Sequence, residues 1–148
     1  MEDRYLYRAK RIDNGEWVQG YLVETRHNTY YDGYRIIDKN GINYDELDYY
    51  EPSFISYVID KTTICQCTGL KDTDGKLIWE NDIVVFLDTY STENGPEEMG
   101  CIGKIVWDDE TISFQVTNRL SAESYEVLDE YSVIGNKFDN TELLESEE

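Results

Sequence analysis

Residues 65–84 read Cys65-Gln66-Cys67-Thr68-Gly69-Leu70-Lys71-Asp72-Thr73-Asp74-Gly75-Lys76-Leu77-Ile78-Trp79-Glu80-Asn81-Asp82-Ile83-Val84. This segment predicts a strand, a turn at Asp74-Gly75, a short apolar strand and the start of a third strand. An Asp-Gly pair accepts the positive φ of a tight turn, and the apolar residues on either side favour a hairpin. The segment holds no nucleophile paired with a base, no phosphate-binding loop and no metal-binding motif. It therefore specifies architecture rather than chemistry.

Turns of the same kind recur in the first half of the chain. Asn14-Gly15 and Asn40-Gly41 each separate two runs of apolar and aromatic residues, so each pair predicts a hairpin turn. The chain has 13 tyrosines and 3 tryptophans, which favour strands over helices. We therefore predict a mainly β protein (a β-rich α+β fold) built from antiparallel hairpins.

The second half is predicted to close into a small SH3-like barrel of antiparallel strands. Within residues 81–87 the apolar run is continuous from Ile83 to Leu87, as expected of a strand buried on both faces. Residues 88–100 are polar, include Gly95-Pro96 and predict a long exposed loop. The remaining predicted elements are a strand at 101–107, a turn at 108–110, a strand at 111–117 with Ile112, Phe114 and Val116 on one face, and a closing strand at 131–138.

Helix signals are weak and predict one or two short helices. Residues 121–129 fit one short helix or a turn, because they begin with a serine that suits a cap and Tyr125 and Leu128 follow at helical spacing. Residues 49–59 fit either a short helix near Pro52 or a strand, and both interpretations stay open. We expect three segments, namely a β-rich subdomain at 1–64, an acidic barrel at 65–140 and a flexible acidic tail at 141–148.

Negative charge is the strongest compositional feature, with a formal net charge of −19 at pH 7. Residues 1–64 carry 8 basic and 12 acidic side chains, whereas residues 65–148 carry 5 and 20, a net charge of −15. Binding to nucleic acid needs clustered Lys and Arg, so we predict no direct contact with DNA or RNA. No apolar run approaches the ~20 residues that cross a bilayer, and no apolar signal region opens the chain. We predict no membrane partner and a cytoplasmic location.

The three cysteines are Cys65, Cys67 and Cys101, a number that gives no disulfide framework. Cys65 and Cys67 would share one face of a strand, because side chains alternate with a period of two. A zinc site built from these residues with Cys101 and the single histidine, His27, would need a spacing that Cys-x-Cys does not supply. We interpret the thiols as small buried apolar groups and predict no metal ion and no cofactor.

Other candidate catalytic groups have simpler explanations. His27 stands in a polar stretch that suits a surface turn. The neighbouring acids Asp108-Asp109 and Glu97-Glu98 would face opposite ways in a strand, so they do not form a carboxylate dyad. Asp72-Thr73-Asp74-Gly75 is faintly similar to a calcium loop, but counting from Asp72 places Ile83 where the bidentate glutamate would stand. We predict no catalytic residue and no enzymatic activity.

Three blocks of sequence resemble the YopX family of phage and prophage proteins. The central block is Gln66-Cys67-Thr68-Gly69-Leu70-Lys71-Asp72, followed by Asp74-Gly75-Lys76 and Glu80-Asn81-Asp82-Ile83-Val84. Tyr7-Arg8-Ala9 with Trp17 and Gly20 is similar to the family's opening, and Val133-Ile134-Gly135-Asn136 with Asp139-Asn140 and Glu142-Leu143-Leu144 is similar to its close. Cys67 replaces a usual aromatic residue and Asn81 a usual glycine, although Asn tolerates a left-handed backbone.

The resemblance implies a β-rich phage protein, located in a bacterial host cell, of unknown function and with a capacity to form homo-oligomers. We expect a non-catalytic module that binds itself or a phage or host protein with a basic surface. Tyr30-Tyr31 and Tyr49-Tyr50 fit an interface and a core equally well. One alternative is an acidic mimic of nucleic acid that inhibits a host DNA-binding protein, and another is a metal-dependent enzyme. The mimic would use Asp45, Glu46, Asp48, Glu51 and the carboxylates from Glu123 to Glu130.

Overall fold

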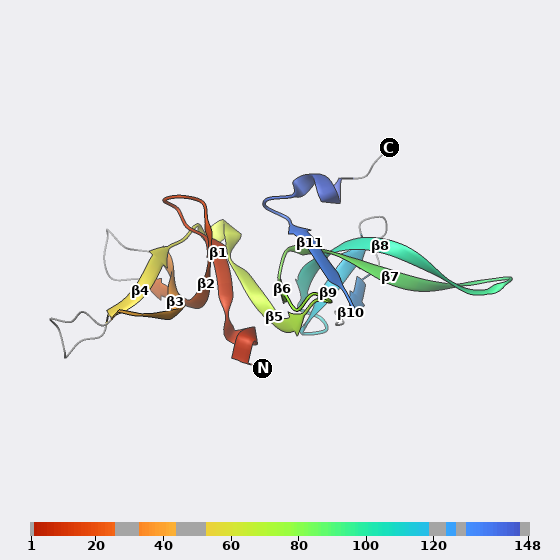
Figure 1. The fold of residues 1–148 in the computed structure, drawn as a ribbon, viewed down its shortest axis with the longest axis horizontal. Helices are drawn as coiled ribbons and strands as arrows, with labels where there is room; N and C mark the ends of the chain where they lie inside the picture. Colours follow the sequence, from red (N-terminus) through yellow and green to blue (C-terminus); the bar gives the residue numbers. More distant parts are fainter. Residues whose placement is uncertain (1, 26–32, 44–52, 119–123, 127–129, 146–148) are drawn as a thin grey trace. The chain divides into compact units, whose positions relative to one another are not determined.

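A computed structural model describes residues 2–25, 33–43, 53–118, 124–126 and 130–145. Within these residues the chain forms two antiparallel sheets, and its helices are three short 3₁₀ turns (Figure 1). The prediction of a mainly β fold is confirmed, whereas the predicted short helices are 3₁₀ turns at other positions. The chain divides into two compact units, Met1–Cys67 and Thr68–Glu148.

The first unit is an antiparallel sheet in the order β4-β3-β2-β1-β5. A bridge between Arg11 and Ile59 joins the end of β1 to the end of β4, and the Ile12 N–H donates to the Val58 carbonyl at 3.1 Å. The sheet therefore curves around its core. The elements are η1 (Glu2–Tyr5), β1 (Tyr7–Lys10), β2 (Trp17–Thr25), β3 (Gly33–Asn43), β4 (Ser53–Val58), η2 (Lys61–Thr63) and the first residues of β5 (Cys65–Lys71).

Buried side chains fill the inside of this curved sheet. Ala9, Ile36 and Ile59 are almost fully buried, and apolar side chains from β1 to β4 pack against them. Cys65 and Cys67 are also fully buried on β5, which confirms their prediction as buried thiols on one face of a strand. Several strands contribute to this core, because side chains alternate along a strand and each strand turns one row of them inward.

The two Asn-Gly pairs of the first unit have different outcomes. Asn14-Gly15 lies in the turn between β1 and β2, with Gly15 at φ +72°, so that hairpin is confirmed. Asn40-Gly41 lies inside β3, so the predicted turn there is wrong. The pairing of β3 with β4 shifts register between Ile37 and Ile42 instead. Extra residues in one strand of a pair are accommodated as a bulge without reversing the chain.

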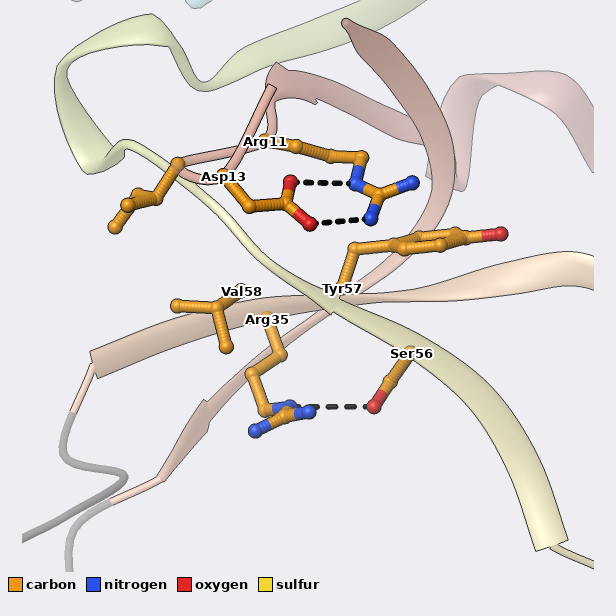
Figure 2. A pocket seen from close by; sticks show the side chains of 7 residues that line it. Arg11, Asp13, Arg35, Ser56, Tyr57 and Val58 are labelled. Carbon is orange, nitrogen blue, oxygen red and sulfur yellow. Dashed lines mark hydrogen bonds and ion pairs between the residues drawn. The ribbon is translucent and has the colours of Figure 1, made fainter. Parts of the chain in front are cut away.

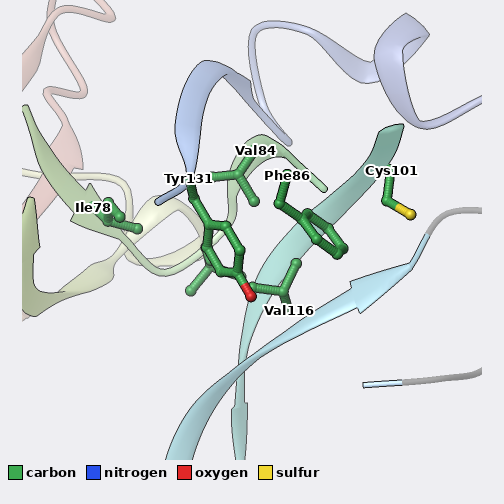
Figure 3. Packing of buried hydrophobic residues seen from close by; sticks show 7 residues of the cluster. Ile78, Val84, Phe86, Cys101, Val116 and Tyr131 are labelled. Atoms are coloured by element: carbon green, nitrogen blue, oxygen red, sulfur yellow. The ribbon is translucent and has the colours of Figure 1, made fainter. Parts of the chain in front are cut away.

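The second unit contains an antiparallel sheet in the order β10-β9-β8-β7-β11. Its core is built from residues of β6 to β9 and from Tyr131. The ring centroids of Tyr131 and Phe86 are 4.9 Å apart (Figure 3). The elements, after the end of β5, are β6 (Leu77–Trp79), β7 (Asp82–Thr92), β8 (Gly95–Asp108), β9 (Ser113–Asn118), β10 (Ser124–Glu126), β11 (Ser132–Asn136) and η3 (Thr141–Leu144).

The segment that opens this unit folds as its sequence predicts. A turn joins β5 to β6, with the Asp72 N–H donating to the Lys76 carbonyl at 2.7 Å and Gly75 at φ +81°. β7 begins with the buried residues Asp82, Ile83 and Val84. Asn81 adopts φ +69°, which confirms that it takes the left-handed conformation usual for glycine at that place.

Three predictions for the second half are wrong. Residues 88–100 form paired strands rather than a loop, because β7 continues to Thr92 and β8 begins at Gly95. Ile112 lies in a turn at φ +52° and is 76% exposed, so only Phe114 and Val116 of that strand pack on the core. The helix predicted at 121–129 is replaced, in its described part, by β10 paired with β9.

Four further expectations concern the ends of elements and their arrangement. For residues 49–59, where helix and strand stayed open, the described part is the strand β4. Within the predicted tail at 141–148, Thr141–Leu144 form η3, and the flexibility of the tail stays a prediction. The closing strand predicted at 131–138 is present as β11. The SH3-like arrangement of the second unit stays a prediction.

Candidate functional site

The long hairpin of β7 and β8 extends past the other strands of its sheet as a two-stranded ribbon (Figure 1). We call residues 87–100 of this hairpin the β-arm. Its pairing runs from Leu87 opposite Gly100 to Thr92 opposite Gly95, with Glu93 and Asn94 in the turn. The Thr92 hydroxyl donates to the Gly95 carbonyl at 2.6 Å and accepts from the Asn94 N–H at 3.2 Å, which fixes the tip.

Apolar side chains of the β-arm are exposed. Leu87 is 66% exposed, Met99 48% and Tyr90 44%. Leu87 lies opposite Gly100, where a Cβ atom would meet nothing within 4 Å, so no side chain of the described chain shields it from across the ribbon. Burying an apolar side chain of this size stabilises a protein or a complex by about 1.5 to 3 kcal/mol. A partner that covered these side chains would gain that free energy on binding.

The hydrogen-bonding register of β7 follows from one bond at its base. Val133 of β11 lies opposite Val84, and its N–H donates to the carboxylate of Asp72 at 3.1 Å rather than to β7. Val84 and Val133 are therefore a non-hydrogen-bonded pair, and the backbone groups of the next residue, Val85, point toward β11.

The same alternation continues into the β-arm. The N–H and C=O groups of Leu87, Thr89 and Ser91 point toward the outer edge of β7, away from β8. β11 ends its pairing at Val85, so no strand in the described residues covers this edge of the arm. Pro96 stands opposite Ser91 in a pair that requires no N–H from it, which explains why proline is accepted within β8.

The β-arm is strongly acidic. It carries the carboxylates of Asp88, Glu93, Glu97 and Glu98, and no Lys or Arg occurs between Lys76 and Lys104. Glu97 accepts a hydrogen bond of 2.9 Å from the Tyr90 hydroxyl across the ribbon. The field of the arm is therefore negative along its whole length, which favours approach of a cationic partner.

A cavity of about 280 Å³ lies on the first unit, at the β1–β2 turn and β4 (Figure 2). The Arg11 guanidinium donates to both carboxylate oxygens of Asp13 and lies 4.7 Å from the centre of the Tyr57 ring. The Arg35 Nε donates to the Ser56 hydroxyl at 3.2 Å. Ile12 and Val58 complete the walls. This volume falls at the lower limit of small-molecule sites.

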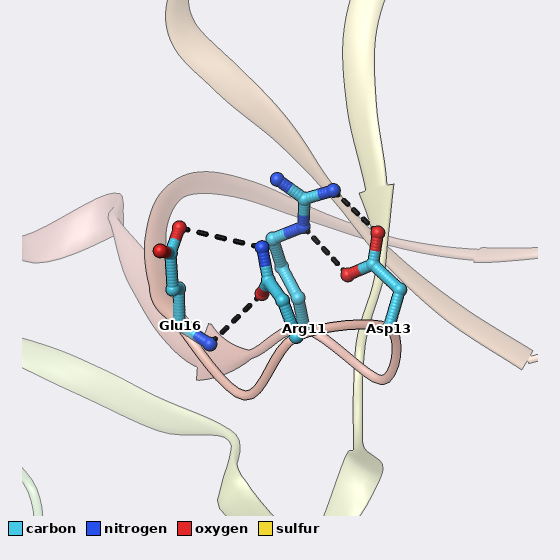
Figure 4. A network of polar contacts seen from close by, with 4 residues as sticks. Arg11, Asp13 and Glu16 are labelled. Atoms are coloured by element: carbon cyan, nitrogen blue, oxygen red, sulfur yellow. Dashed lines mark hydrogen bonds and ion pairs between the residues drawn. The ribbon is translucent and has the colours of Figure 1, made fainter.

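The charged groups of this cavity mainly hold the turn together (Figure 4). The hydrogen bond from Arg11 lowers the pKa of Asp13, and the same bond raises the pKa of Arg11. The Asn14 side chain accepts from the Glu16 N–H at 2.9 Å and donates to the Glu16 carboxylate at 3.3 Å. A wider hollow of about 570 Å³ lies beside it, lined in part by Glu24, Tyr34 and Lys61. The lining residues of these two hollows do not include a cysteine or a histidine.

Several residues named as candidates from the sequence lie outside the described chain. These are His27, the two tyrosine pairs, the acids from Asp45 to Glu51, and Glu123 and Asp129 from the later acidic segment. Asp108 accepts from the Glu110 N–H and Asp109 from the Trp107 indole N–H, so this acidic pair has turn roles. Glu97 and Glu98 are consecutive in β8 and lie on opposite faces of the β-arm.

The cysteines and the Asp72 turn also have structural roles. Cys101 is 5% exposed within the core of the second unit, whereas Cys65 and Cys67 belong to the first. Asp72 is 6% exposed and accepts backbone N–H groups from Asp74, Lys76 and Val133. Among the residues described, no group of three or more Cys, His, Asp or Glu side chains is placed to hold a metal ion.

The β-arm is the functional candidate that sequence reasoning missed. Its signal is two runs of equal length around Glu93-Asn94, rich in Thr, Tyr and Ser on the first side. Such residues favour strands even where both faces meet water.

None of the helices in the described residues has the length and hydrophobicity that a membrane span requires.

Comparisons with known proteins place the chain in a family. The model of the family described as "YopX protein" matches residues 6–145. The crystal structure of protein EF1440 from Enterococcus faecalis is similar, with a TM-score of 0.55 and 25% sequence identity over 94% of this chain and 96% of that one. No curated protein is significantly similar. The chain therefore belongs to the YopX family.

Proposed function

We propose that this YopX protein is a non-catalytic interaction module of a phage or prophage, acting in the bacterial cytoplasm, and that the β-arm is its contact surface for a protein. The observation that carries the proposal is the arm itself, a paired ribbon with exposed Leu87, Tyr90 and Met99 and with an outer edge of β7 that no strand of the described chain covers. Uncovered strand edges favour unwanted association, so a long one is a liability unless a partner uses it.

The smaller cavity supports binding less well than the arm does. The guanidinium of Arg11 is engaged by Asp13, and Ser56 accepts from Arg35. A catalytic site needs a nucleophile within hydrogen-bond reach of a base, together with groups that stabilise developing charge. The lining residues combine no such groups, which favours interaction over catalysis as the role of the protein.

Self-association through two β-arms is disfavoured by charge. Each arm carries four carboxylates and no basic side chain, so pairing two arms would bring like charges together. Self-association through another surface stays a prediction that light scattering can test. Imitation of nucleic acid also stays a prediction, because most of the carboxylates that suggested it lie outside the described residues.

An arm-shortened variant tests the proposal. Replacing Thr89–Glu98 by Asn-Gly would leave Asp88 and Met99 as the closing pair of a tight hairpin and keep the core intact. Full-length and shortened proteins would each be used to capture partners from host extract, followed by quantitative mass spectrometry. We expect a protein that is enriched by the full chain and lost with the shortened arm. Equal recovery by both proteins would contradict the proposal.

A further inference from the structure

We infer that the outer edge of β7, from Leu87 to Ser91, binds one extended segment of a cationic partner protein as an added strand. The inference rests on the proposed function of the β-arm and names the chemistry of its partner. Addition of a strand to an open sheet edge is a common mode of peptide recognition, in which backbone hydrogen bonds give affinity and alternate side chains give selectivity.

The backbone of this edge is prepared for such a strand. The N–H and C=O groups of Leu87, Thr89 and Ser91 point outward, as the register at Val133 requires. β11 already occupies the same edge of β7 up to Val85, so an added strand would lie in line with β11. The opposite edge of the arm is less suitable, because Pro96 has no N–H to donate there.

The two faces of the arm define the side chains of the partner. Leu87 and Thr89 lie on one face, where Leu87 is exposed beside Gly100. Asp88 and Tyr90 lie on the other face. Across the ribbon, Glu98 of β8 shares the face of Thr89, and Glu97 and Met99 share the face of Tyr90 and Asp88, but the direct neighbours of a strand added to β7 are the side chains of β7 itself. An added strand would thus place apolar side chains beside Leu87 and cationic side chains beside Asp88. The fitting segment alternates cationic and apolar residues.

Charge selects this partner over a second copy of the chain. The arm holds four carboxylates, and the protein as a whole has a net charge of −19. A basic segment is attracted by this field, whereas an acidic segment or another arm is repelled. The attraction is screened by salt, but backbone pairing and apolar contact are not, so binding should weaken without vanishing at high ionic strength.

Labelled synthetic peptides of roughly eight residues, the length of a common strand, provide the probes for fluorescence anisotropy. The first alternates Lys and Val, the second has the same composition with all Lys before all Val, and the third alternates Glu and Val. The alternating Lys-Val peptide should bind about tenfold more tightly than the block peptide, and the Glu-Val peptide should not bind. Equal affinity of the two cationic peptides would show simple attraction to an acidic protein and would overturn the inference.

Two triple variants with the same net charge locate the site. The first is Glu93→Lys, Glu97→Lys, Glu98→Lys on the arm, and the matched control is Glu110→Lys, Glu130→Lys, Glu142→Lys on exposed positions elsewhere in the unit. The arm variant should bind the alternating Lys-Val peptide about tenfold more weakly than wild type does, and the control variant should lose much less affinity. An equal loss in both variants would overturn the inference.

A proline variant tests the backbone pairing. Thr89→Pro removes an N–H that points to the outer edge of β7. Thr89 and its partner Glu98 are a non-hydrogen-bonded pair, so the pairing of β7 with β8 should remain. We expect about a tenfold loss of affinity for the alternating peptide, with unchanged circular dichroism. Unchanged affinity would overturn the added-strand mode. If no cationic peptide binds while the arm-shortened variant still loses a cellular protein, this inference fails and the proposed function stands.

Discussion

The carboxylate of Asp72 accepts a hydrogen bond of 3.1 Å from the backbone N–H of Val133, which lies 61 residues later in the sequence. Its other oxygen accepts from the N–H groups of Asp74 and Lys76, each at 2.9 Å. One buried side chain thus closes the β5–β6 turn and holds that turn against β11. The aspartate that ends the Thr-Gly-Leu-Lys-Asp segment is therefore a structural anchor of the second unit.

Asp72→Asn should destabilise the second unit. An asparagine keeps one carbonyl oxygen but turns an NH₂ group toward a backbone donor, so at least one buried N–H loses its acceptor. The expected loss is about 1 to 3 kcal/mol in the free energy of unfolding, measured by urea denaturation. Asp74→Asn is the matched control, because its side chain is exposed, and it should change stability by less than about 0.5 kcal/mol. Equal effects of the two substitutions would refute the anchor role.

The contribution of Asp72 should depend on pH. Burial by itself raises the pKa of this carboxyl, but the hydrogen bonds from Val133, Lys76 and Asp74 outweigh it and lower the pKa below the ordinary value. Folding thus favours the charged form of Asp72. The stabilisation by this carboxylate is complete above the pKa that Asp72 has in the unfolded chain, and it is lost as the pH falls through its lower pKa in the folded protein. The difference in the free energy of unfolding between wild type and Asp72→Asn should be largest at neutral pH and should decrease below about pH 4. A difference that increases in acid would contradict this assignment.

Gly103→Ala should destabilise the sheet at its centre. Gly103 is buried in β8, and a Cβ atom there would collide with the Thr117 carbonyl oxygen and the Val116 side chain. Overpacking of this kind costs about 1 to 3 kcal/mol, which thermal unfolding would detect. Gly100→Ala, three residues earlier in the same strand, meets nothing within 4 Å and should be nearly neutral. A neutral Gly103→Ala would show that β8 does not pack so closely against Val116 and Thr117 of β9.

Substitutions of two neighbouring residues at the base of the β-arm should have very different effects on the free energy of unfolding. Phe86 is 6% exposed and packs on Tyr131, whereas Leu87 is 66% exposed. Phe86→Ala should cost about 3 to 5 kcal/mol in the free energy of unfolding. Leu87→Ala should change it by less than about 0.5 kcal/mol. Denaturant titration of both variants compares them directly, and a large loss with Leu87→Ala would mean that the arm folds back on its own unit.

Much of the fold could be predicted because local turn chemistry agrees with strand pairing. Asn14-Gly15 and Asp74-Gly75 form the predicted turns, and each has glycine at positive φ. Asn40-Gly41 has the same signal but lies within β3, between residues that pair with β2 up to Asp38 and residues that pair with β4 from Ile42, so the strand continues through it. Tertiary pairing there overrides a local preference, which a single sequence does not reveal.

The functional candidate was harder to predict than the fold. Residues 88–100 look like a loop because they are polar and contain Gly95-Pro96. A ribbon that meets water on both faces needs no apolar alternation, so the usual strand pattern is missing. Proline is accepted because the Ser91–Pro96 pair requires no N–H from it. The helix predicted at 121–129 failed for a related reason, since pairing with β9 decides the conformation of Ser124–Glu126.

Site-specific photo-crosslinking in the bacterial host tests the central claim, that the β-arm is the surface through which the protein works. A photoreactive phenylalanine derivative would replace Thr89 on the arm or, as the control, Ile112 in the exposed turn at the other end of β8. We predict a covalent adduct with a partner protein from position 89 and none from position 112. Adducts from position 112 alone, or equal adducts from both positions, would contradict the account.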